Sequence, residues 1–378
     1  MKSKKLKPEI IKKIVKDNIT GIDAVEIIPL INLGSALKGT ISCLKQGLIP
    51  ASYSYSKEKT ESAYSYKNYK SWAKSIIVAA KYYYTDEKFP EEKAFGRIAR
   101  FTWRNNYRYL SLKLEDAVNK ISDNIGIPII SKILSNYTSI PEKALCKYSG
   151  IADFGKNSVL INRSMGSYFT VGEAFIDLDI DFDEIKELEA PDYTLCGSCN
   201  LCRAACPTHA IIKNGVININ RCFQYISENL ILMPLKYREK WGNRLYGCSI
   251  CIDVCPYNKN LVPWAKKHNI GFVGQGMDLL EVLSLKQEEW NRTFIDNQIV
   301  IRDPGAILKN AITSLGYLEY KKSIDFLFPF LNHEHEIIRA YTAWAIGKIN
   351  TKTGKKMLYA RYKEEKSQMV KTEIECIL

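Results

Sequence analysis

The chain has 378 residues, of which 46% are hydrophobic and 25% are charged, and its formal net charge is +13 at pH 7. This composition is typical of a globular protein with two or three domains, and it excludes a disordered chain and a small disulfide-stapled one. No stretch approaches the roughly 20 apolar residues of a membrane span, and the first residues lack the apolar run of an export signal. We therefore expect a cytoplasmic protein that binds no membrane. The positive charge favours an anionic partner, with nucleic acid as the first candidate and an acidic membrane surface as the second, and an inert basic surface is the alternative.

Residues 1–185 mix strand and helix patterns. Residues 75–84, SIIVAAKYYY, are β-branched and aromatic, which predicts a buried strand. From Ser111 onward apolar residues recur at helical spacing, and residues 159–180 predict two strands around a glycine-containing turn. We expect an α+β or α/β domain with a central sheet, followed by an acidic linker at 179–193.

Residues 266–378 predict a helical domain. The segments ILKNAITSLG and IRAYTAWAIG end at Gly316 and Gly347, and both carry apolar residues at helical spacing before a final glycine. This weak repeat is typical of a pair of HEAT-like helical repeats, and a simple helical cap is the alternative.

Eight of the 11 cysteines lie between residues 196 and 255. The first group, Cys196, Cys199, Cys202 and Cys206 followed by Pro207, has the spacing of the bacterial ferredoxin run, whose fourth cysteine ligates the other of two clusters. In a cytosolic chain such clustering indicates metal binding rather than disulfides. We predict a ferredoxin-like domain over residues 186–265.

The second group ends in the same way but lacks its leading cysteine, which Cys222 can supply. Exchange of the fourth ligands then gives two complete [4Fe–4S] ligand sets. The first set is Cys196, Cys199, Cys202 and Cys255, and the second is Cys206, Cys222, Cys248 and Cys251. The number of cysteines and the two Cys-Pro endings disfavour zinc, and we expect the remaining Cys43, Cys146 and Cys376 to be small apolar residues. Two adjacent clusters carry electrons, but no Gly-x-Gly-x-x-Gly stretch identifies a nucleotide acceptor.

Over nearly its whole length the chain resembles the epoxyqueuosine reductase family. The resemblance rests on GRIARFTWRNNY (96–107), on SGIADFGKNSVLINRSMGSYFTVGE (149–173), on the double cluster with its isolated cysteine, and on the HEAT-like tail. It implies a base-off cobalamin between the N-terminal domain and the cluster domain, and reduction of epoxyqueuosine to queuosine in the anticodon stem-loop of tRNA. It further implies a low-potential electron donor such as flavodoxin or ferredoxin, and a monomer suits an enzyme that embraces tRNA.

The same resemblance implies site residues. Near the cobalamin it places Arg100, the turn Gly155, Lys156, Asn157 and Ser158, and the loop Gly166, Ser167 and Tyr168. Tyr107 would lie near its upper face. A plain turn and a core aromatic residue are the corresponding structural alternatives.

The chain departs from the family at the expected proton donor. Members usually carry Asp-Thr-Gly ahead of the helix that begins near Pro141, and here Asn136 occupies the place of the aspartate. An amide does not donate a proton as an acid, so Tyr107, Asp153 or a water would supply it, or the substrate differs. Two alternatives stay open: a cobalamin and iron–sulfur reductase of another small molecule, such as an organohalide, and a non-catalytic electron-transfer or corrinoid protein.

Overall fold

The structure, a computed structural model, describes residues 6–53, 56–137, 140–264 and 267–378. They form two compact units made of interleaved segments. The first unit holds Met1–Asp86, Asn106–Asn220 and Ile250–Ile270, and the second holds Glu87–Asn105, Arg221–Ser249 and Gly271–Leu378. The three consecutive domain ranges predicted from the sequence stay a prediction. Across the described ranges, no helix combines the length and the apolar character that a bilayer crossing requires.

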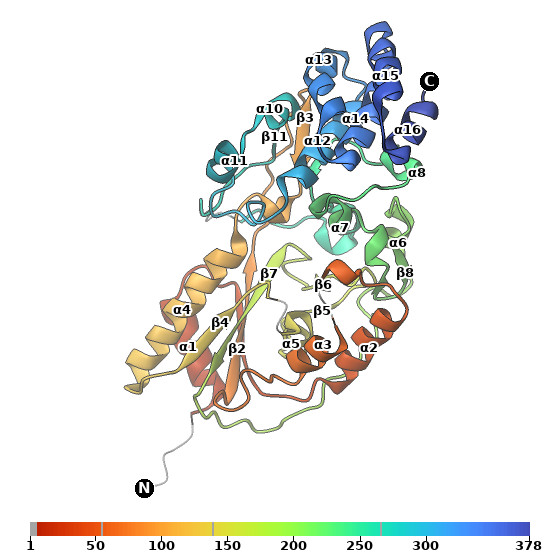
Figure 1. Cartoon of the computed structure of the whole chain (residues 1–378). Helices are drawn as coiled ribbons and strands as arrows, with labels where there is room; N and C mark the ends of the chain where they lie inside the picture. The colour runs from red at the N-terminus through yellow and green to blue at the C-terminus, as the bar shows by residue number, and fades with distance from the viewer. Residues whose placement is uncertain (1–5, 54–55, 138–139, 265–266) are drawn as a thin grey trace. The chain divides into compact units, whose positions relative to one another are not determined.

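A four-stranded antiparallel sheet forms the centre of the first unit (Figure 1). Its strand order is β1 (Ala24–Pro29), β2 (Ser75–Tyr82), β7 (Phe169–Ile176) and β4 (Ser131–Leu134). The predicted buried strand is confirmed, because β2 is buried along almost its whole length between β1 and β7. Every pairing is antiparallel, so the domain is α+β.

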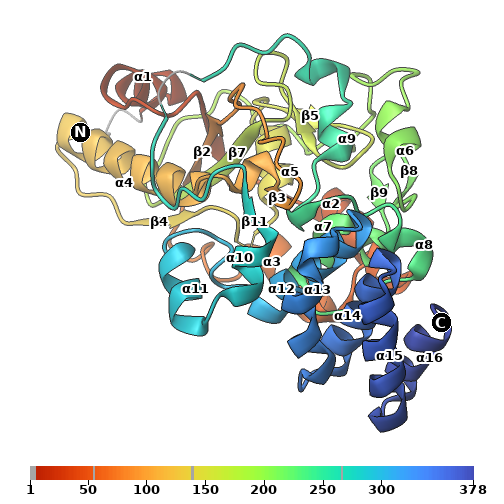
Figure 2. The ribbon, with the colours of Figure 1, turned by 90° about the horizontal axis from the view of Figure 1, so that it is seen from above.

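Helices cover both faces of this sheet, as Figures 1 and 2 show. Side chains on β2 alternate: Ile76 and Val78 enter one core, whereas Ile77 and Ala79 enter the other. The helices α1 (Pro8–Asn18) and α4 (Asn106–Ile125) pack on the second core. The first core is covered by α2 (Gly34–Lys45), α3 (Lys57–Tyr64) and α5 (Glu142–Tyr148). The helix expected from Ser111 onward is therefore confirmed as part of α4.

A short hairpin leads into the last central strand. Its strands, β5 (Asp153–Phe154) and β6 (Leu160–Ile161), pair with each other around a turn in which the Gly155 N–H donates to the Val159 carbonyl at 2.8 Å. The two strands expected within residues 159–180 are β6 and β7. However, β6 pairs with β5 rather than with β7, because residues 162–166 form a turn of their own.

The cysteine-rich segment consists of short elements. The first unit contributes α6 (Leu201–Ala205), β8 (Ile211–Lys213), β9 (Val216–Ile217) and α9 (Ile250–Asp253). The second unit contributes α7 (Phe223–Glu228), α8 (Leu235–Arg238) and β10 (Arg244–Tyr246).

The second unit is mainly helical. A small sheet has the order β10, β3 (Phe95–Ile98) and β11 (Gly276–Asp278). The helices that follow β11 are α10 (Leu279–Ser284), α11 (Gln287–Thr293), α12 (Pro304–Tyr317), α13 (Ile324–Leu327), α14 (Glu336–Ile349), α15 (Lys352–Glu364) and α16 (Gln368–Glu375). The two repeat segments are α12 and α14, which pack against each other. A side chain at Gly316 would lie 2.7 Å from the Cα of Ala345, so the glycine permits this close approach.

A buried ion pair stabilises this helical unit. Both terminal nitrogens of Arg238 on α8 donate to the carboxylate of Glu373 on α16, each at 2.7 Å. Because removal of one partner leaves a buried charge uncompensated, we expect Glu373→Ala to lower the free energy of unfolding by about 3–5 kcal/mol. Anaerobic urea unfolding followed by circular dichroism would measure the change. The exposed Glu364→Ala on α15 is the control, and equal effects of the two substitutions would contradict the assignment.

Candidate functional site

The first cysteine loop is a tight turn that leads into α6. The Cys199 N–H donates to the Cys196 carbonyl at 2.9 Å, and Gly197 between them has a φ of +47°, where glycine is favoured. The loop ends at Cys206, whose sulfur accepts the Ala210 N–H at 3.2 Å. The helix α6 ends at Ala205, and Cys206 follows in extended backbone that leaves the helix, before Pro207.

The structure brings Cys255, which is distant in sequence, close to this loop. Burial raises the pKa of the Cys202 thiol, and the charges of Cys196, Cys199 and Cys255 raise it further. The pKa of Cys255 is raised by burial and then by Cys196 and Cys199. These four cysteines are the first predicted ligand set, and each lies within electrostatic range of another member.

The second predicted set takes two cysteines from each unit. Cys206 and Cys251 belong to the first unit, and Cys222 and Cys248 belong to the second. Within the second unit, Cys222 immediately precedes α7. The Cys248 N–H donates to Gln224 on that helix at 3.1 Å. In the described part of the chain no three His, Cys, Asp or Glu side chains are grouped as a site for one metal ion.

The turn between β5 and β6 holds the cysteine loops. Lys156 is buried, and its Nζ donates to the carbonyls of Gly197 at 2.6 Å and Cys199 at 3.0 Å. The backbone N–H of Lys156 donates to the Cys196 sulfur at 3.4 Å. The neighbouring Asn157 donates to the Cys251 carbonyl at 3.1 Å. The two side chains predicted to line a cobalamin are therefore hydrogen-bonded to backbone next to predicted cluster ligands.

The loop before β7 contacts residues next to Cys255. Gly166 has a φ of +57°, and a side chain there would collide with Asn258. The Asn258 Oδ1 accepts the Ser167 N–H at 2.7 Å, and the Tyr168 hydroxyl donates to Asp253 at 2.9 Å. This loop thus fixes the second cysteine segment against the sheet.

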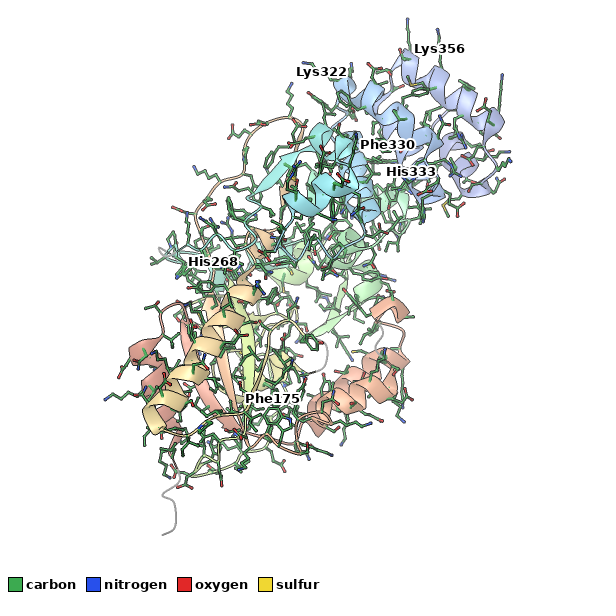
Figure 3. The ribbon with its side chains drawn as sticks, turned by 60° about the vertical axis from the view of Figure 1, so that its left-hand side comes forward. Phe175, His268, Lys322, Phe330, His333 and Lys356 are labelled. Atoms are coloured by element: carbon green, nitrogen blue, oxygen red, sulfur yellow. The ribbon has the colours of Figure 1, made fainter. Side chains whose placement is uncertain are left out.

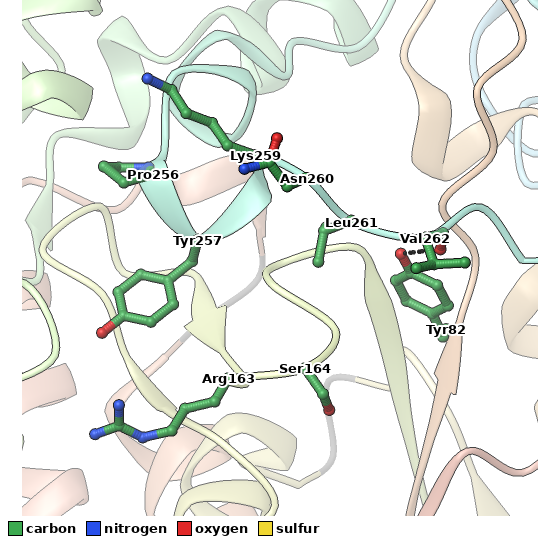
Figure 4. Close-up of a pocket in the computed structure, with 9 residues that line it drawn as sticks. All are labelled: Tyr82, Arg163, Ser164, Pro256, Tyr257, Lys259, Asn260, Leu261 and Val262. Atoms are coloured by element: carbon green, nitrogen blue, oxygen red, sulfur yellow. Dashed lines mark hydrogen bonds between the residues drawn. The ribbon is translucent and has the colours of Figure 1, made fainter.

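A pocket of about 420 Å³ lies beside this loop (Figure 4). Its volume is within the range of small-molecule sites. The lining comes from two segments and one strand: Arg163 and Ser164, residues 256–257 and 259–262, and Tyr82 on β2. Buried hydroxyls of Ser167 and Thr170, close in sequence to this lining, have no hydrogen-bond partner among the described residues.

The catalytic candidates from the sequence lie in different surroundings. Asn136 is exposed two residues after the end of β4, with a φ of +58°. Tyr107 is half-buried in the first turn of α4. Asp153 accepts two hydrogen bonds from the Lys147 ammonium, at 2.8 and 2.9 Å. Arg100 belongs to the second unit, where its guanidinium lies 4.4 Å from the Trp103 ring centre.

Sequence reasoning missed two polar residues on α12 that hold the segment between Cys222 and Cys248. The Lys309 ammonium is fully buried and donates to the carbonyls of Ile226 and Asn229, while Asn310 donates to those of Ser227 and Leu245. Burial lowers the pKa of Lys309 to about 7. The sequence signal that could have indicated them is the presence of two adjacent polar residues in an otherwise apolar helix.

Sequence reasoning also missed two carboxyl groups beside the loop that carries Asn136. Glu142 begins α5, and Glu173 is fully buried on β7. A glutamate within a strand that is otherwise buried was the only sequence signal for the second group.

Comparisons with known proteins agree with the geometry. A family described as a 4Fe-4S double cluster binding domain matches residues 195–258, which contain all eight clustered cysteines, and HEAT repeats match residues 298–377. The predictions of two [4Fe–4S] clusters and of HEAT-like helices are thereby confirmed, while the assignment of individual ligands stays a prediction.

Two curated relatives and one solved structure are similar over most of the chain. The epoxyqueuosine reductase of Vibrio cholerae is 30% identical over 71% of this chain and 69% of its own length. That of Staphylococcus aureus is 26% identical over 72% of this chain and 71% of its own. A crystal structure of epoxyqueuosine reductase with an epoxyqueuosine-modified tRNA stem loop has a TM-score of 0.83, with 24% identity over 97% of this chain and 96% of that one.

The Lys156 contacts lead to a test of cluster stability. We expect Lys156→Met to leave the Gly197 and Cys199 carbonyls without their donor, so that the first cluster is lost several-fold faster in air. The decay of iron–sulfur absorbance after aerobic exposure of the reconstituted protein would measure this. Lys213→Met, at an exposed lysine on β8, is the matched control, and identical decay of both variants would contradict the role of Lys156.

Proposed function

Because the chain belongs to the epoxyqueuosine reductase family, we propose that it reduces epoxyqueuosine to queuosine in tRNA. The observation that carries the proposal is this family membership. The cysteines of the chain match the double-cluster domain, and the fold brings Cys255 close to Cys196, Cys199 and Cys202. The reaction is an oxidoreduction in which the epoxide takes up two electrons and two protons and releases water.

Two [4Fe–4S] clusters would supply the electrons one at a time. Cys196, Cys199, Cys202 and Cys255 would hold one, and Cys206, Cys222, Cys248 and Cys251 the other. The fold supports the first set, because it brings Cys255 close to the loop that begins at Cys196, more than 50 positions earlier in the sequence. An external low-potential donor, such as flavodoxin or ferredoxin, would reload the clusters.

Cobalamin would be the site of the chemistry. When bound, it supplies a strongly reducing and nucleophilic cobalt centre. The hydroxyls of Ser167 and Thr170 are buried and have no hydrogen-bond partner among the described residues, so they fit a polar ligand at the beginning of β7. Gly166, Ser167 and Tyr168, with Gly155 and Ser158, would position it, whereas the side chains of Lys156 and Asn157 serve the cysteine loops. Arg100 and Tyr107 stay candidates from the family resemblance.

An anionic nucleic acid accounts for the basic composition. The net charge of +13 favours binding of phosphates. Lys352, Lys355 and Lys356 on α15 are exposed, and Figure 3 shows Lys356 on this helix. We propose the anticodon stem-loop of tRNA as the partner and a cytoplasmic monomer as the working form.

One observation favours a second candidate function. The exposed side chain at the expected acid position is that of Asn136, and an amide does not protonate a leaving oxygen. A reductase of another small molecule, built on the same cofactors, would not require an acid at this position.

Mass spectrometry of the modified nucleoside tests the first candidate against the second. The protein would be reconstituted anaerobically with iron, sulfide and cobalamin, reduced, and mixed with tRNA that carries epoxyqueuosine. We expect the nucleoside to lose one oxygen atom. An intact epoxide, in the presence of reduced clusters and bound cobalamin, would contradict the proposed substrate and favour the second candidate.

The assignment of Cys222 to the second ligand set makes a prediction about the iron content of the protein. We expect Cys222→Ala to lose one cluster, so that about four irons per chain remain in place of about eight. Iron analysis and low-temperature electron paramagnetic resonance would measure this. Cys43→Ala, outside both sets, is the control and should keep full iron content, whereas full content in Cys222→Ala would exclude Cys222 as a ligand.

A further inference from the structure

The two cysteines that the second unit contributes to the second predicted ligand set are connected through one glutamine side chain. Cys222 immediately precedes α7, and Cys248 follows β10 after one intervening residue. Gln224, in the first turn of α7, accepts the backbone N–H of Cys248 on its Oε1 at 3.1 Å. One side chain therefore fixes the backbone of one predicted ligand against the helix that begins beside the other.

Glu228, the last residue of α7, fixes the orientation of this glutamine. Its Oε1 accepts the Gln224 Nε2 at 2.6 Å. A carboxylate only accepts hydrogen bonds, so the amide turns its nitrogen toward Glu228 and its oxygen toward Cys248. The same carboxylate oxygen also accepts the Tyr246 hydroxyl at 3.0 Å and the Arg302 Nη2 at 3.3 Å. Burial raises the pKa of Tyr246, and the charge of Glu228 raises it further, so this hydroxyl remains a hydrogen-bond donor.

The ion pair of Glu228 and Arg302 is largely shielded from solvent. The Glu228 side chain is 9% exposed and that of Arg302 is 28% exposed. The Arg302 Nε also donates to the Tyr246 hydroxyl at 3.2 Å, so the guanidinium is held at two points. Charges in such surroundings are screened less than charges at the surface. Glu228 follows Cys222 by only six positions, which is roughly 9 Å along a helix, so its charge acts on a cluster bound at Cys222.

The helix α12 holds the two cysteine-bearing segments together by separate contacts. It packs on α7 and on β10, and Figure 1 shows α7 and α12 in this unit. Asn310 donates to the carbonyls of Ser227 and Leu245, each at 2.8 Å, and thus to one carbonyl on each segment. The Ser227 hydroxyl in turn accepts the Gly247 N–H at 3.0 Å. A substitution of Glu228 that keeps its shape should therefore change the charge beside Cys248 without displacing the segments.

Hydrogen bonds and charges around an iron–sulfur cluster set its reduction potential. An N–H that donates to a cluster sulfur, or a nearby cation, stabilises the additional negative charge of the reduced cluster, whereas a nearby anion disfavours it. Here the Cys248 N–H is donated to Gln224, and the Glu228 carboxylate lies behind that glutamine. Both features favour a low potential, which a strongly reducing reaction requires.

We propose that Gln224 and Glu228 are positioning residues for the second cluster, which fix Cys248 against Cys222 and hold the reduction potential of that cluster low. Arg302 is the counter-charge that limits the effect of Glu228. This inference rests on the proposed function, and within it on the assignment of Cys222 and Cys248 as ligands. The step concerned is the uptake of one electron from the external donor and its release toward the substrate, in which no covalent bond to the protein forms or breaks.

An anaerobic redox titration of the reconstituted protein, followed by electron paramagnetic resonance, tests the charge of Glu228. Cys222→Ala, which should keep only the first cluster, identifies the reduction step of each cluster. We expect Glu228→Gln to raise the potential of the second cluster, although the glutamine oxygen can still accept the three hydrogen bonds. At a fixed potential the ratio of reduced to oxidised second cluster should rise about tenfold, which is about 59 mV for one electron. The step of the first cluster should not move.

Arg302→Gln tests the same pair with the opposite sign. Removal of the cation should lower the potential of the second cluster by a similar amount, and the double variant should lie close to the unmodified protein. A general disturbance of the fold would not produce shifts of opposite sign that cancel. Glu288→Gln, at an exposed glutamate of α11, removes a charge elsewhere in the unit and is the matched control.

Gln224→Leu tests the hydrogen bond to Cys248. This variant removes the acceptor of the Cys248 N–H, which can then donate to a cluster sulfur, so we expect a higher potential of the second cluster with Glu228 intact. An unchanged potential in all three single variants would overturn the proposal, and so would shifts of the same sign in Glu228→Gln and Arg302→Gln. If Glu228→Gln loses its second cluster, the direction of the shift in Arg302→Gln decides.

The titration needs no tRNA, so its outcome is separate from that of the nucleoside assay. An intact epoxide in that assay would overturn the proposed substrate, while the potentials would still report on Gln224 and Glu228. Full iron content in Cys222→Ala would overturn the ligand assignment and this inference with it.

Discussion

The contact between the Lys156 ammonium and two carbonyl oxygens of the first cysteine loop is the interaction on which the first unit depends. A loop that turns sharply enough to direct three thiols to one cluster leaves backbone carbonyls without partners, and a buried cation satisfies two of them. Lys156 lies in the β5–β6 turn, which the chain places just before the last central strand. The sheet thereby fixes the loop, and Asn157 and the Ser167 N–H extend the same support to the segment of Cys251 and Cys255.

The sequence predicted those elements whose burial pattern can be recognised within a short run of consecutive residues. The strand β2 was predicted from a run of β-branched residues, and α4 was predicted from apolar residues at helical spacing. The cluster type followed from cysteine spacing, because the geometry of a cubane constrains the short loop that holds it. The pairing of β6 with β5 did not follow, since a two-residue strand carries almost no pattern of its own.

The supporting residues of the site could not be predicted, because their partners are distant in sequence. Lys156 contacts a loop about 40 positions later, and Lys309 reaches carbonyls about 80 positions earlier. In most proteins a lysine in a turn or in a helix is exposed to solvent. Only the tertiary structure shows that these two are buried and hydrogen-bonded to the backbone between predicted cluster ligands.

Buried charged residues in this chain fall into two physical classes. Lys309 donates to two carbonyls, and Lys81 lies near Asp23 and over the Trp264 ring, so their burial is compensated by the fold itself. Glu173 has no such compensation in the described structure, although a leucine or methionine of similar size would fill the same core space without a desolvation cost. The stability of the sheet therefore does not account for a carboxyl group at this position.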